Sequence, residues 1–363
     1  MLPTDIPDML RSKGLRPPAT LTLSITGSCN IACRHCWVDA GTDTAIGHAP
    51  EPLLDRLIGE FAAIGGTGIR FTGGEPLCYP GWPGLVRLAR SAGFRNISLQ
   101  TNAMLVTDED VAALRALDFP GLSIQVSLDG ATAPTHDLVR GSGSHQAALE
   151  GIRRLVAGGL GPRITIFFTE MRHNLAELPA LLELADDMSI GSVTTGTLVR
   201  CGRAEEPAAV AAPDPAQFLE LLDRYDSDPV FCERYERIGT VAALEWRKSP
   251  LRTECCTFVE NPYLTPDGRL FPCLLCHTPK FSVPGVFEKG LAAAFTEGAP
   301  LWSALRRTSS SRADTLAACR DCPEQPACAG GCMGRAWGSC GDLLAPDDRC
   351  QARRAIARRK RQG

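Results

Sequence analysis

The sequence predicts an α/β protein in which a partial (β/α)6 TIM-like barrel is followed by a small cysteine-rich domain. Two observations lead to this prediction. Six short β-like runs alternate with helix-like stretches over residues 21–198, and ten of the sixteen cysteines lie between Cys255 and Cys350. Alternating strands and helices are typical of parallel sheets with crossover helices. A chain of 363 residues is long enough for such a barrel and a second, smaller unit.

The six predicted strands are rich in Ile, Val, Leu, Thr and Phe. They cover residues 21–26, 69–72, 97–101, 122–128, 163–168 and 192–198. Amphipathic segments at 53–65, 85–93, 109–117 and 145–159 lie between them, and several end at a glycine, as helices prefer. This spacing suits an open or partial barrel at least as well as a doubly wound sheet. In either fold, ligands bind at the carboxyl ends of the strands.

The predicted organisation has five parts. They are an N-terminal extension (1–20), the barrel core (21–212), a helical linker (213–254), the cysteine-rich domain (255–352) and a basic C-terminal tail (353–363). The stretch 200–215, "RCGRAEEPAAVAAPDP", is rich in Ala and Pro and is interpreted as the connection between barrel and tail.

Composition excludes several function classes. The formal net charge of -3 makes nucleic acid an unlikely partner, and no run of about 18 apolar residues suggests a membrane span. The first residues lack the basic and apolar regions of a signal peptide, so a cytoplasmic location is expected. Because cytosolic thiols are kept reduced, sixteen cysteines indicate metal binding or catalysis rather than disulfides.

Three cysteines follow the first predicted strand in "GSCNIACRHCW" (27–37). Cys29, Cys33 and Cys36 are spaced C-x3-C-x2-C, which suits a [4Fe–4S] cluster with one iron left open. A structural zinc site would need a fourth ligand, and His35 is poorly placed because it is adjacent to Cys36. The loops "GGEPL" (73–77), "NA" (102–103) and "DG" (129–130) follow the next three strands and should meet at the same rim.

The cysteine motif after the first strand, together with G-G-E-P after the second, resembles the radical S-adenosylmethionine (SAM) superfamily. The resemblance implies that the amino and carboxylate groups of SAM bind the fourth iron. It further implies that backbone groups of Gly73, Gly74 and Glu75 meet the SAM amino group, that Ser127 and Arg140 hold its ribose and carboxylate, and that Leu198 packs on its adenine. Simpler interpretations remain open: a glycine turn, a surface Arg140 paired with Asp137, and a Leu198 that belongs to the core.

The tail resembles the SPASM extension of radical SAM enzymes. Its cysteines follow a G-x4-C pattern at Gly268 and Cys273 and a C-x2-C-x5-C-x3-C pattern before a final cysteine. The resemblance implies two auxiliary [4Fe–4S] clusters, and so three clusters in all. One would use Cys319, Cys322, Cys328 and Cys350. The other would use Cys273, Cys332 and Cys255 or Cys256, completed by the second of that pair or by Cys276.

Two questions about the tail stay open at this point. Zinc ribbons also use C-x2-C pairs, so structural zinc is an alternative. The remaining cysteines have no place in the pattern and are interpreted as packing residues: Cys78, Cys201, Cys232 and Cys340.

The family resemblance implies an enzyme that cleaves SAM reductively to a 5′-deoxyadenosyl radical, which abstracts hydrogen from a substrate. Ribosomally made peptides are the expected substrates, with tetrapyrrole precursors as the alternative. Sulfatase maturation is disfavoured, because that group has an Asp after the G-x4-C cysteine where this chain has Leu274. A catalytically silent iron–sulfur protein is the contrasting hypothesis.

The resemblance also implies partners. A low-potential electron donor of the flavodoxin or ferredoxin type would reduce the cluster. Only 28 residues precede Cys29, fewer than the roughly 80 that a fused leader-peptide-binding domain needs. A peptide substrate is therefore expected to bind the core directly or through a separate recognition protein.

Overall fold

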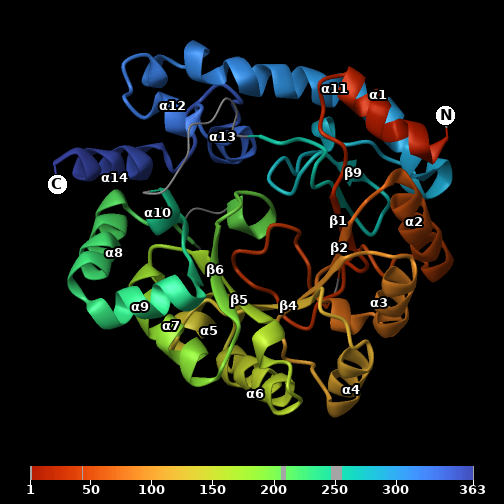
Figure 1. The fold of residues 1–363 in the computed structure, drawn as a ribbon, viewed down its shortest axis with the longest axis horizontal. Helices are drawn as coiled ribbons and strands as arrows, with labels where there is room; N and C mark the ends of the chain where they lie inside the picture. The colour runs from red at the N-terminus through yellow and green to blue at the C-terminus, as the bar shows by residue number, and fades with distance from the viewer. Residues whose placement is uncertain (1, 43, 206–209, 247–255, 363) are drawn as a thin grey trace.

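The computed structural model describes residues 2–42, 44–205, 210–246 and 256–362, so Cys255 lies outside the described residues. The chain forms a nine-stranded sheet in the order β7-β6-β5-β4-β3-β2-β1-β8-β9. Neighbouring strands from β1 to β6 are consecutive in sequence and parallel. The two ends of the sheet do not pair with each other, so the structure confirms the predicted partial barrel (Figure 1).

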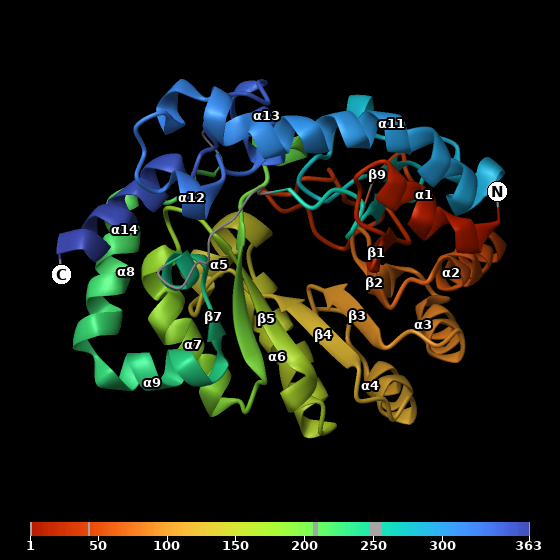
Figure 2. The same cartoon turned by 45° about the horizontal axis from the view of Figure 1, so that its top comes forward.

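The six predicted strands all form, each within three residues of its expected ends. They are β1 (Thr20–Ser24), β2 (Gly68–Thr72), β3 (Asn96–Thr101), β4 (Leu122–Ser127), β5 (Ile164–Glu170) and β6 (Ser192–Thr197). The connecting helices are α2 (Glu51–Ile64), α3 (Trp82–Ser91), α4 (Asp108–Ala116), α5 (Ala133–Arg140), α6 (Ser144–Ala157) and α7 (Leu178–Asp187). These helices lie on the outer side of the sheet (Figures 1 and 2).

Each strand places apolar and polar side chains on opposite faces. Leu21 and Leu23 of β1 and Ile69 and Phe71 of β2 are buried in the main hydrophobic core under the outer helices. The alternate positions on the inner face are mostly polar, as with Thr22 of β1. Because side chains alternate along a strand, burying the apolar set against the helices turns the polar set into the barrel interior.

The sheet extends beyond the six predicted strands at both ends. β7 (Gly239–Thr240) pairs in parallel with β6, and β8 (Tyr263–Leu264) pairs in parallel with β1. β9 (Leu270–Phe271) closes a hairpin with β8. The cysteine-rich domain therefore begins as a continuation of the barrel sheet, beside the strand that precedes the three-cysteine loop.

Helices at the two chain ends pack onto this framework. α1 (Ile6–Ser12) contacts the long α11 (Val286–Thr315), which kinks at Gly290 with a φ of 79° (Figure 2). Ile6 and Leu10 of α1 are buried in the main core, so the predicted extension is part of the fold. The other helices are α8 (Pro215–Ser227), α9 (Pro229–Ile238), α10 (Ala242–Glu245), α12 (Gln325–Cys328), α13 (Met333–Cys340) and α14 (Cys350–Gln362).

The predicted basic tail at 353–363 is helical in the part of it that the structure describes. Residues up to Gln362 belong to α14, which packs on α8 (Figure 1). Ile356 and Ala357 are buried, and Arg359 pairs with Asp223 and Asp226 of α8. The segment is rich in arginine, and its few apolar residues recur at helical spacing, which allows one face to pack on α8.

A buried ion pair connects the barrel to the cysteine-rich domain. Arg349, the residue before Cys350, pairs with Glu170 at the end of β5, and both side chains are almost fully buried. The Glu170 carboxylate also accepts a hydrogen bond from the Thr195 hydroxyl at 2.7 Å. The guanidinium lies over the ring of Phe218 in α8, 5.0 Å from its centre. Arg349 therefore holds the last cysteine segment against the barrel.

We predict that Arg349→Met will loosen this attachment. Removal of one partner leaves the Glu170 charge buried and unpaired, which costs about 3–5 kcal/mol. Urea titration should show a lower unfolding midpoint, and limited proteolysis should cut within residues 256–362 sooner than in the unchanged protein. The control is Arg361→Met, which removes a more exposed pair with Glu324 and should cost no more than about 1 kcal/mol. Equal midpoints for both variants would contradict the prediction.

Candidate functional site

A cavity of about 280 Å³ lies at the carboxyl ends of the barrel strands. Side chains or backbone from the loops after β1 and β2, from the ends of β3 to β6 and from the tail contribute to its wall. The structure brings all nine predicted cluster and SAM residues to this cavity: Cys29, Cys33, Cys36, Gly73, Gly74, Glu75, Ser127, Arg140 and Leu198.

The three-cysteine loop is held in place mainly by backbone hydrogen bonds. The Cys29 amide donates to the Gly41 carbonyl at 3.0 Å. Arg203 reaches across from the segment after β6, and its guanidinium donates to the carbonyls of Cys33 and Ala40 at 2.8 and 2.7 Å. The first residues of the predicted 200–215 linker thus clamp the cysteine loop as well as connecting two domains. Burial raises the pKa of the Cys29 thiol to about 12, because it disfavours the charged form.

Gly73 and Gly74 allow the loop after β2 to touch the cysteine loop. An added Cβ would lie 2.6 Å from the Thr26 carbonyl oxygen at Gly73 and 2.4 Å from the Ser28 carbonyl oxygen at Gly74. The Gly74 amide donates to the Thr26 carbonyl at 2.8 Å, and the Glu75 amide to the Ser28 carbonyl at 2.9 Å. The amides are therefore used within the protein. The SAM amino group is a donor when charged, so the groups that suit it here are the carbonyls.

The Glu75 side chain turns away from this contact and into the loop after β3. Its carboxylate accepts hydrogen bonds from the Thr101 hydroxyl and the Asn102 amide, both at 2.7 Å, and from the Leu77 amide at 3.1 Å. Burial raises its pKa to about 7, although these donors act in the opposite direction. The Asn102 side chain donates in turn to Asn30 of the cysteine loop at 2.7 Å. Glu75 thereby ties the loops after β1, β2 and β3 together.

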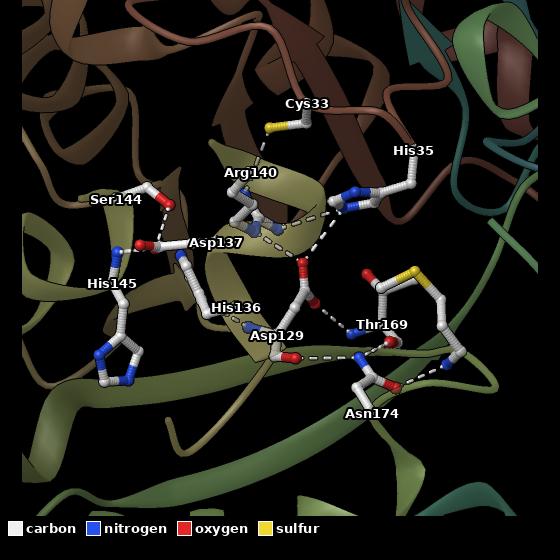
Figure 3. Close-up of polar contacts among 11 residues, drawn as sticks. Cys33, His35, Asp129, His136, Asp137, Arg140, Ser144, His145, Thr169 and Asn174 are labelled. Carbon is white, nitrogen blue, oxygen red and sulfur yellow. Dashed lines mark hydrogen bonds and ion pairs between the residues drawn. The ribbon is translucent and has the colours of Figure 1, made fainter. Parts of the chain in front are cut away.

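Arg140, the last residue of α5, is buried beside the cysteine loop. Its Nε donates to Asp129 at 2.6 Å, and one terminal nitrogen lies 4.0 Å from the Cys33 sulfur (Figure 3). His35 Nε2 is 3.2 Å from the same Asp129 oxygen and 3.5 Å from the Arg140 guanidinium. The pairing of Arg140 with Asp137 at the surface is excluded, because Asp137 accepts hydrogen bonds from the first residues of α6 instead.

Asp129 is the centre of this network and is fully buried. Burial acts to raise the pKa of its carboxyl, but Arg140 and His35 outweigh burial and hold that pKa well below its usual range. Its second oxygen accepts a hydrogen bond from the Thr169 amide at 2.8 Å, and its own amide donates to His136 Nδ1 at 3.1 Å (Figure 3). Asp129 is therefore an ionised, fixed acceptor that orients the Arg140 guanidinium.

His136 completes the network as a neutral ring. Burial, with a smaller contribution from Arg140, lowers its pKa to about 3. A neutral ring is required here, because Nδ1 must keep a lone pair to accept the Asp129 amide. Asn174 then bridges the Asp129 and Thr169 carbonyls with hydrogen bonds of 3.0 and 2.9 Å.

The tail reaches the same cavity. Leu274 and Leu275, which lie between Cys273 and Cys276, contribute to its wall. Trp37, the residue after Cys36, contacts the His277 ring edge-on with centroids 5.0 Å apart. His277 also stacks on Phe271 of β9 at 4.3 Å. These contacts fix the tail against the cysteine loop.

The four cysteines predicted for one auxiliary cluster come together in the tail. Cys319, Cys322, Cys328 and Cys350 all line one small cavity, with Arg353 and Arg354 at its edge. Cys319 and Cys350 come from segments that are 31 residues apart in sequence, and α14 carries the second of them into the site.

The structure describes all but one of the cysteines predicted for the second auxiliary cluster, since Cys255 is outside the described residues. Cys276 forms a side-chain hydrogen bond with Cys273, and Cys332 and Cys201 are close enough to raise its pKa further. Cys201 was interpreted as a packing residue, yet the structure places it beside this group. Cys256 is buried. Its neighbour in sequence, Cys255, lies outside the described residues. Cys340 is exposed, and its sulfur contacts the Ala336 carbonyl of its own helix.

Within the described ranges, no three His, Cys, Asp or Glu side chains are grouped to hold a single metal ion. A [4Fe–4S] cluster makes a different demand, because each cysteine binds its own iron. The three thiols on one cavity wall, with a buried cation and the backbone of Gly73 and Gly74 beside them, form a donor set that fits a cluster and SAM.

Sequence reasoning did not predict the roles of three residues of this site: His35, Asp129 and Arg203. His35 was considered only as a metal ligand. Asp129 belongs to the "DG" loop that was expected at the rim, two residues after the end of β4, but its pairing with Arg140 was not predicted. Arg203 lies in "GRA", inside a stretch whose Ala and Pro content suggested a plain linker.

Comparison with known proteins agrees with this geometry. Residues 23–185 match the model of the radical SAM superfamily. Mycofactocin maturase MftC of Mycobacterium ulcerans is 28% identical over 93% of this chain and 89% of its own length. The AdoMet-dependent heme synthase of Methanosarcina barkeri is 26% identical over 92% and 96%. The fold matches a structure of anSMEcpe with bound AdoMet and the Cp18Cys peptide, with a TM-score of 0.72, 15% identity and coverage of 95% and 98%.

No helix in the described ranges of the chain is both long and apolar enough to span a bilayer.

We predict that Gly74→Ala will disrupt the site. The new Cβ would overlap the Ser28 carbonyl and push the cysteine loop away from the loop after β2. After anaerobic reconstitution, the variant should hold about four fewer iron atoms than the unchanged protein and bind SAM more weakly. Iron analysis and SAM titration measure the two effects.

The matched control for this prediction is Gly59→Ala. Gly59 lies within α2, and an added Cβ there meets nothing within 4 Å. Alanine is the better helix former, so this variant should keep all its iron and be equally or more stable. Unchanged iron content and SAM affinity in Gly74→Ala would show that the two loops do not need their close approach.

Proposed function

We propose a function for this chain from the premise that it is a radical SAM enzyme, with residues 23–185 belonging to that superfamily. The proposal is that it modifies a ribosomally synthesised peptide after hydrogen abstraction, forming a crosslink or thioether or changing the configuration of a residue. The observation that carries it is the single cavity shared by Cys29, Cys33, Cys36, the Gly73–Gly74 carbonyls and Arg140.

The chain's own residues divide the work of holding the cofactors. Cys29, Cys33 and Cys36 would bind a [4Fe–4S] cluster, which together with bound SAM supplies a 5′-deoxyadenosyl radical for hydrogen abstraction. Arg140, held by Asp129, would bind the SAM carboxylate through a charge-assisted hydrogen bond. Ser127 would bind the ribose, and Leu198 would pack on the adenine.

The tail cysteines would hold two more [4Fe–4S] clusters. The cavity formed by Cys319, Cys322, Cys328 and Cys350 supports the first. The second would use Cys273, Cys276 and Cys332 with Cys255 or Cys256, and the proximity of Cys276 to Cys273 and Cys332 supports this set. Cys201 lies close enough to be an additional candidate. Such clusters could accept the electron that remains after bond formation or relay electrons from a flavodoxin or ferredoxin.

Peptides are the proposed substrates for two reasons. The M. ulcerans relative is named a maturase, and the anSMEcpe structure holds a peptide beside AdoMet. Leu274 supports a distinction from sulfatase maturation: it lies in the cavity wall, where an Asp base would stand in that group, and an aliphatic side chain cannot accept a proton. A separate leader-peptide recognition protein remains part of the proposal.

A tetrapyrrole precursor is the second candidate substrate. The observation that favours it is the match to the M. barkeri heme synthase, which extends over nearly the full length of both chains. Release of 5′-deoxyadenosine with each candidate substrate, followed by mass analysis of that substrate, separates the two.

We predict that changing Cys29, Cys33 and Cys36 together to Ala will abolish SAM cleavage. With dithionite and SAM under anaerobic conditions, the unchanged protein should release 5′-deoxyadenosine and the variant none, because no other thiol of the described residues lines that cavity. The variant should retain about eight iron atoms in its tail. Continued release of 5′-deoxyadenosine by the variant would contradict the proposed site, and stoichiometric zinc in the tail would contradict the auxiliary clusters.

We further predict that Arg140→Ala will weaken SAM binding. Loss of a charge-assisted hydrogen bond costs about 1.5–3 kcal/mol, or roughly ten- to a hundredfold in affinity. Equilibrium titration with SAM measures the change, and iron content should stay the same. Arg140→Lys keeps the charge but loses the planar guanidinium, so its affinity for SAM should fall between those of the unchanged protein and Arg140→Ala. The control is Arg34→Ala, which changes an exposed arginine of the three-cysteine loop. If the three variants and the unchanged protein all bind SAM with equal affinity, Arg140 is not part of the SAM site.

A further inference from the structure

One layer of the barrel interior is polar. Thr22 of β1, Arg70 of β2, Ser98 of β3 and Ser123 of β4 are neighbours in the strand register and form one layer across the inner face. Closed (β/α)8 barrels fill such layers mainly with branched apolar side chains. Hydroxyl groups and a guanidinium at these positions indicate an interior built to bind a polar group.

A second cavity, of about 430 Å³, lies against this layer at the amino ends of the strands. Arg70 is the charged residue among the described residues that line it. The lining residues nearest to Arg70 in the strand register are Ser98, Ser123 and Thr165, whose hydroxyls can donate hydrogen bonds. The lining therefore presents a cation surrounded by neutral donors.

Arg70 has no acidic partner within the described part of the chain. Its Nε is buried and makes no hydrogen bond, and its nearest polar contact is the Thr22 hydroxyl at 3.5 Å. Burial lowers the pKa of its guanidinium, and no carboxylate acts against that shift. The Arg70 side chain is partly exposed to the cavity, and no carboxylate of the described chain balances its charge, so an anionic group entering the cavity would supply that counter-charge.

The two cavities share one lining residue. Gln125 of β4 lines both of them. Thr72, which lines the upper cavity, is two residues beyond Arg70 on the same strand, or about 7 Å along it. The two cavities adjoin at Gln125, and a substrate that reaches past this side chain from the cysteine rim would approach Arg70.

We propose that Arg70 binds a carboxylate of the substrate at the inner end of the barrel, and so sets how deeply the substrate enters. This inference rests on the proposed function, because both candidate substrates carry carboxylates: a peptide through its C-terminus or acidic side chains, a tetrapyrrole through its propionates. A guanidinium binds a carboxylate with two parallel hydrogen bonds, and the neighbouring hydroxyls can donate to the same oxygens.

The test is protection of Arg70 from phenylglyoxal, a neutral reagent that labels accessible guanidinium groups. The reconstituted holoenzyme with SAM is labelled alone, with propionate, or with propionamide, which has the same shape and no charge. Mass spectrometry of peptides then reports the labelling of Arg70. Propionate should slow that labelling several-fold, whereas propionamide should not. Arg95, an exposed arginine at the same end of the barrel, is the internal control and should be labelled equally throughout.

Two further pairs of probes identify the source of the carboxylate. N-acetylglycylglycine is compared with its C-terminal amide, and coproporphyrin III with its tetramethyl ester. The free acid that protects Arg70 at the lower concentration identifies the peptide or the tetrapyrrole as the natural donor of the carboxylate. Arg70→Gln should weaken binding of that acid about tenfold or more, and Arg95→Gln should leave it unchanged.

Three results would overturn the proposal. They are equal protection by the acid and its uncharged partner, unchanged affinity in Arg70→Gln, and failure of phenylglyoxal to reach Arg70 in the absence of any carboxylate. Release of 5′-deoxyadenosine is assayed separately in the same preparation. Its absence would count against the proposed function, while the labelling result would still decide the carboxylate site.

Discussion

Parallel hydrogen bonding from β1 to β6 is the constraint on which the rest of the structure depends. Because these six strands are consecutive and parallel, their carboxyl ends lie on one rim, and the loops that follow them must meet there. The contact between the loops after β1 and β2 shows how tightly they meet. At Gly73 and Gly74 the backbones approach so closely that no side chain fits between them.

Two buried ion pairs then serve different ends. Asp129 holds Arg140 with its guanidinium against the cysteine loop. Asp129 and its neighbours also make hydrogen bonds with Thr169, Asn174 and His136. Glu170 and Arg349 instead join the barrel to the tail. A buried pair is weak support for stability in general, but it fixes geometry, because any other arrangement would leave a charge unpaired.

The barrel and the tail share the site. The β8–β9 hairpin extends the sheet next to β1, and this position brings Leu274 and Leu275 into the wall of the main cavity. Trp37 and His277, each adjacent in sequence to a cysteine of its own group, touch across the same boundary. The environment of a substrate is therefore formed by both parts of the chain, and changes in the tail will be felt at the rim.

The sequence by itself determined the six strands, the partial barrel and nine of the residues that line the main cavity, because these follow from local periodicity and from motifs that the family resemblance identifies. It could not determine the partner of Arg140, since Asp129 and Asp137 are both near it in sequence and only folding buries one of them. The packing of α14, the clamp made by Arg203 and the position of Cys201 beside Cys276 also depend on contacts between distant segments. Tertiary structure alone decided the unpaired state of Arg70, because a missing counter-charge is a property of all the strands that surround a side chain, and no stretch of sequence contains them together.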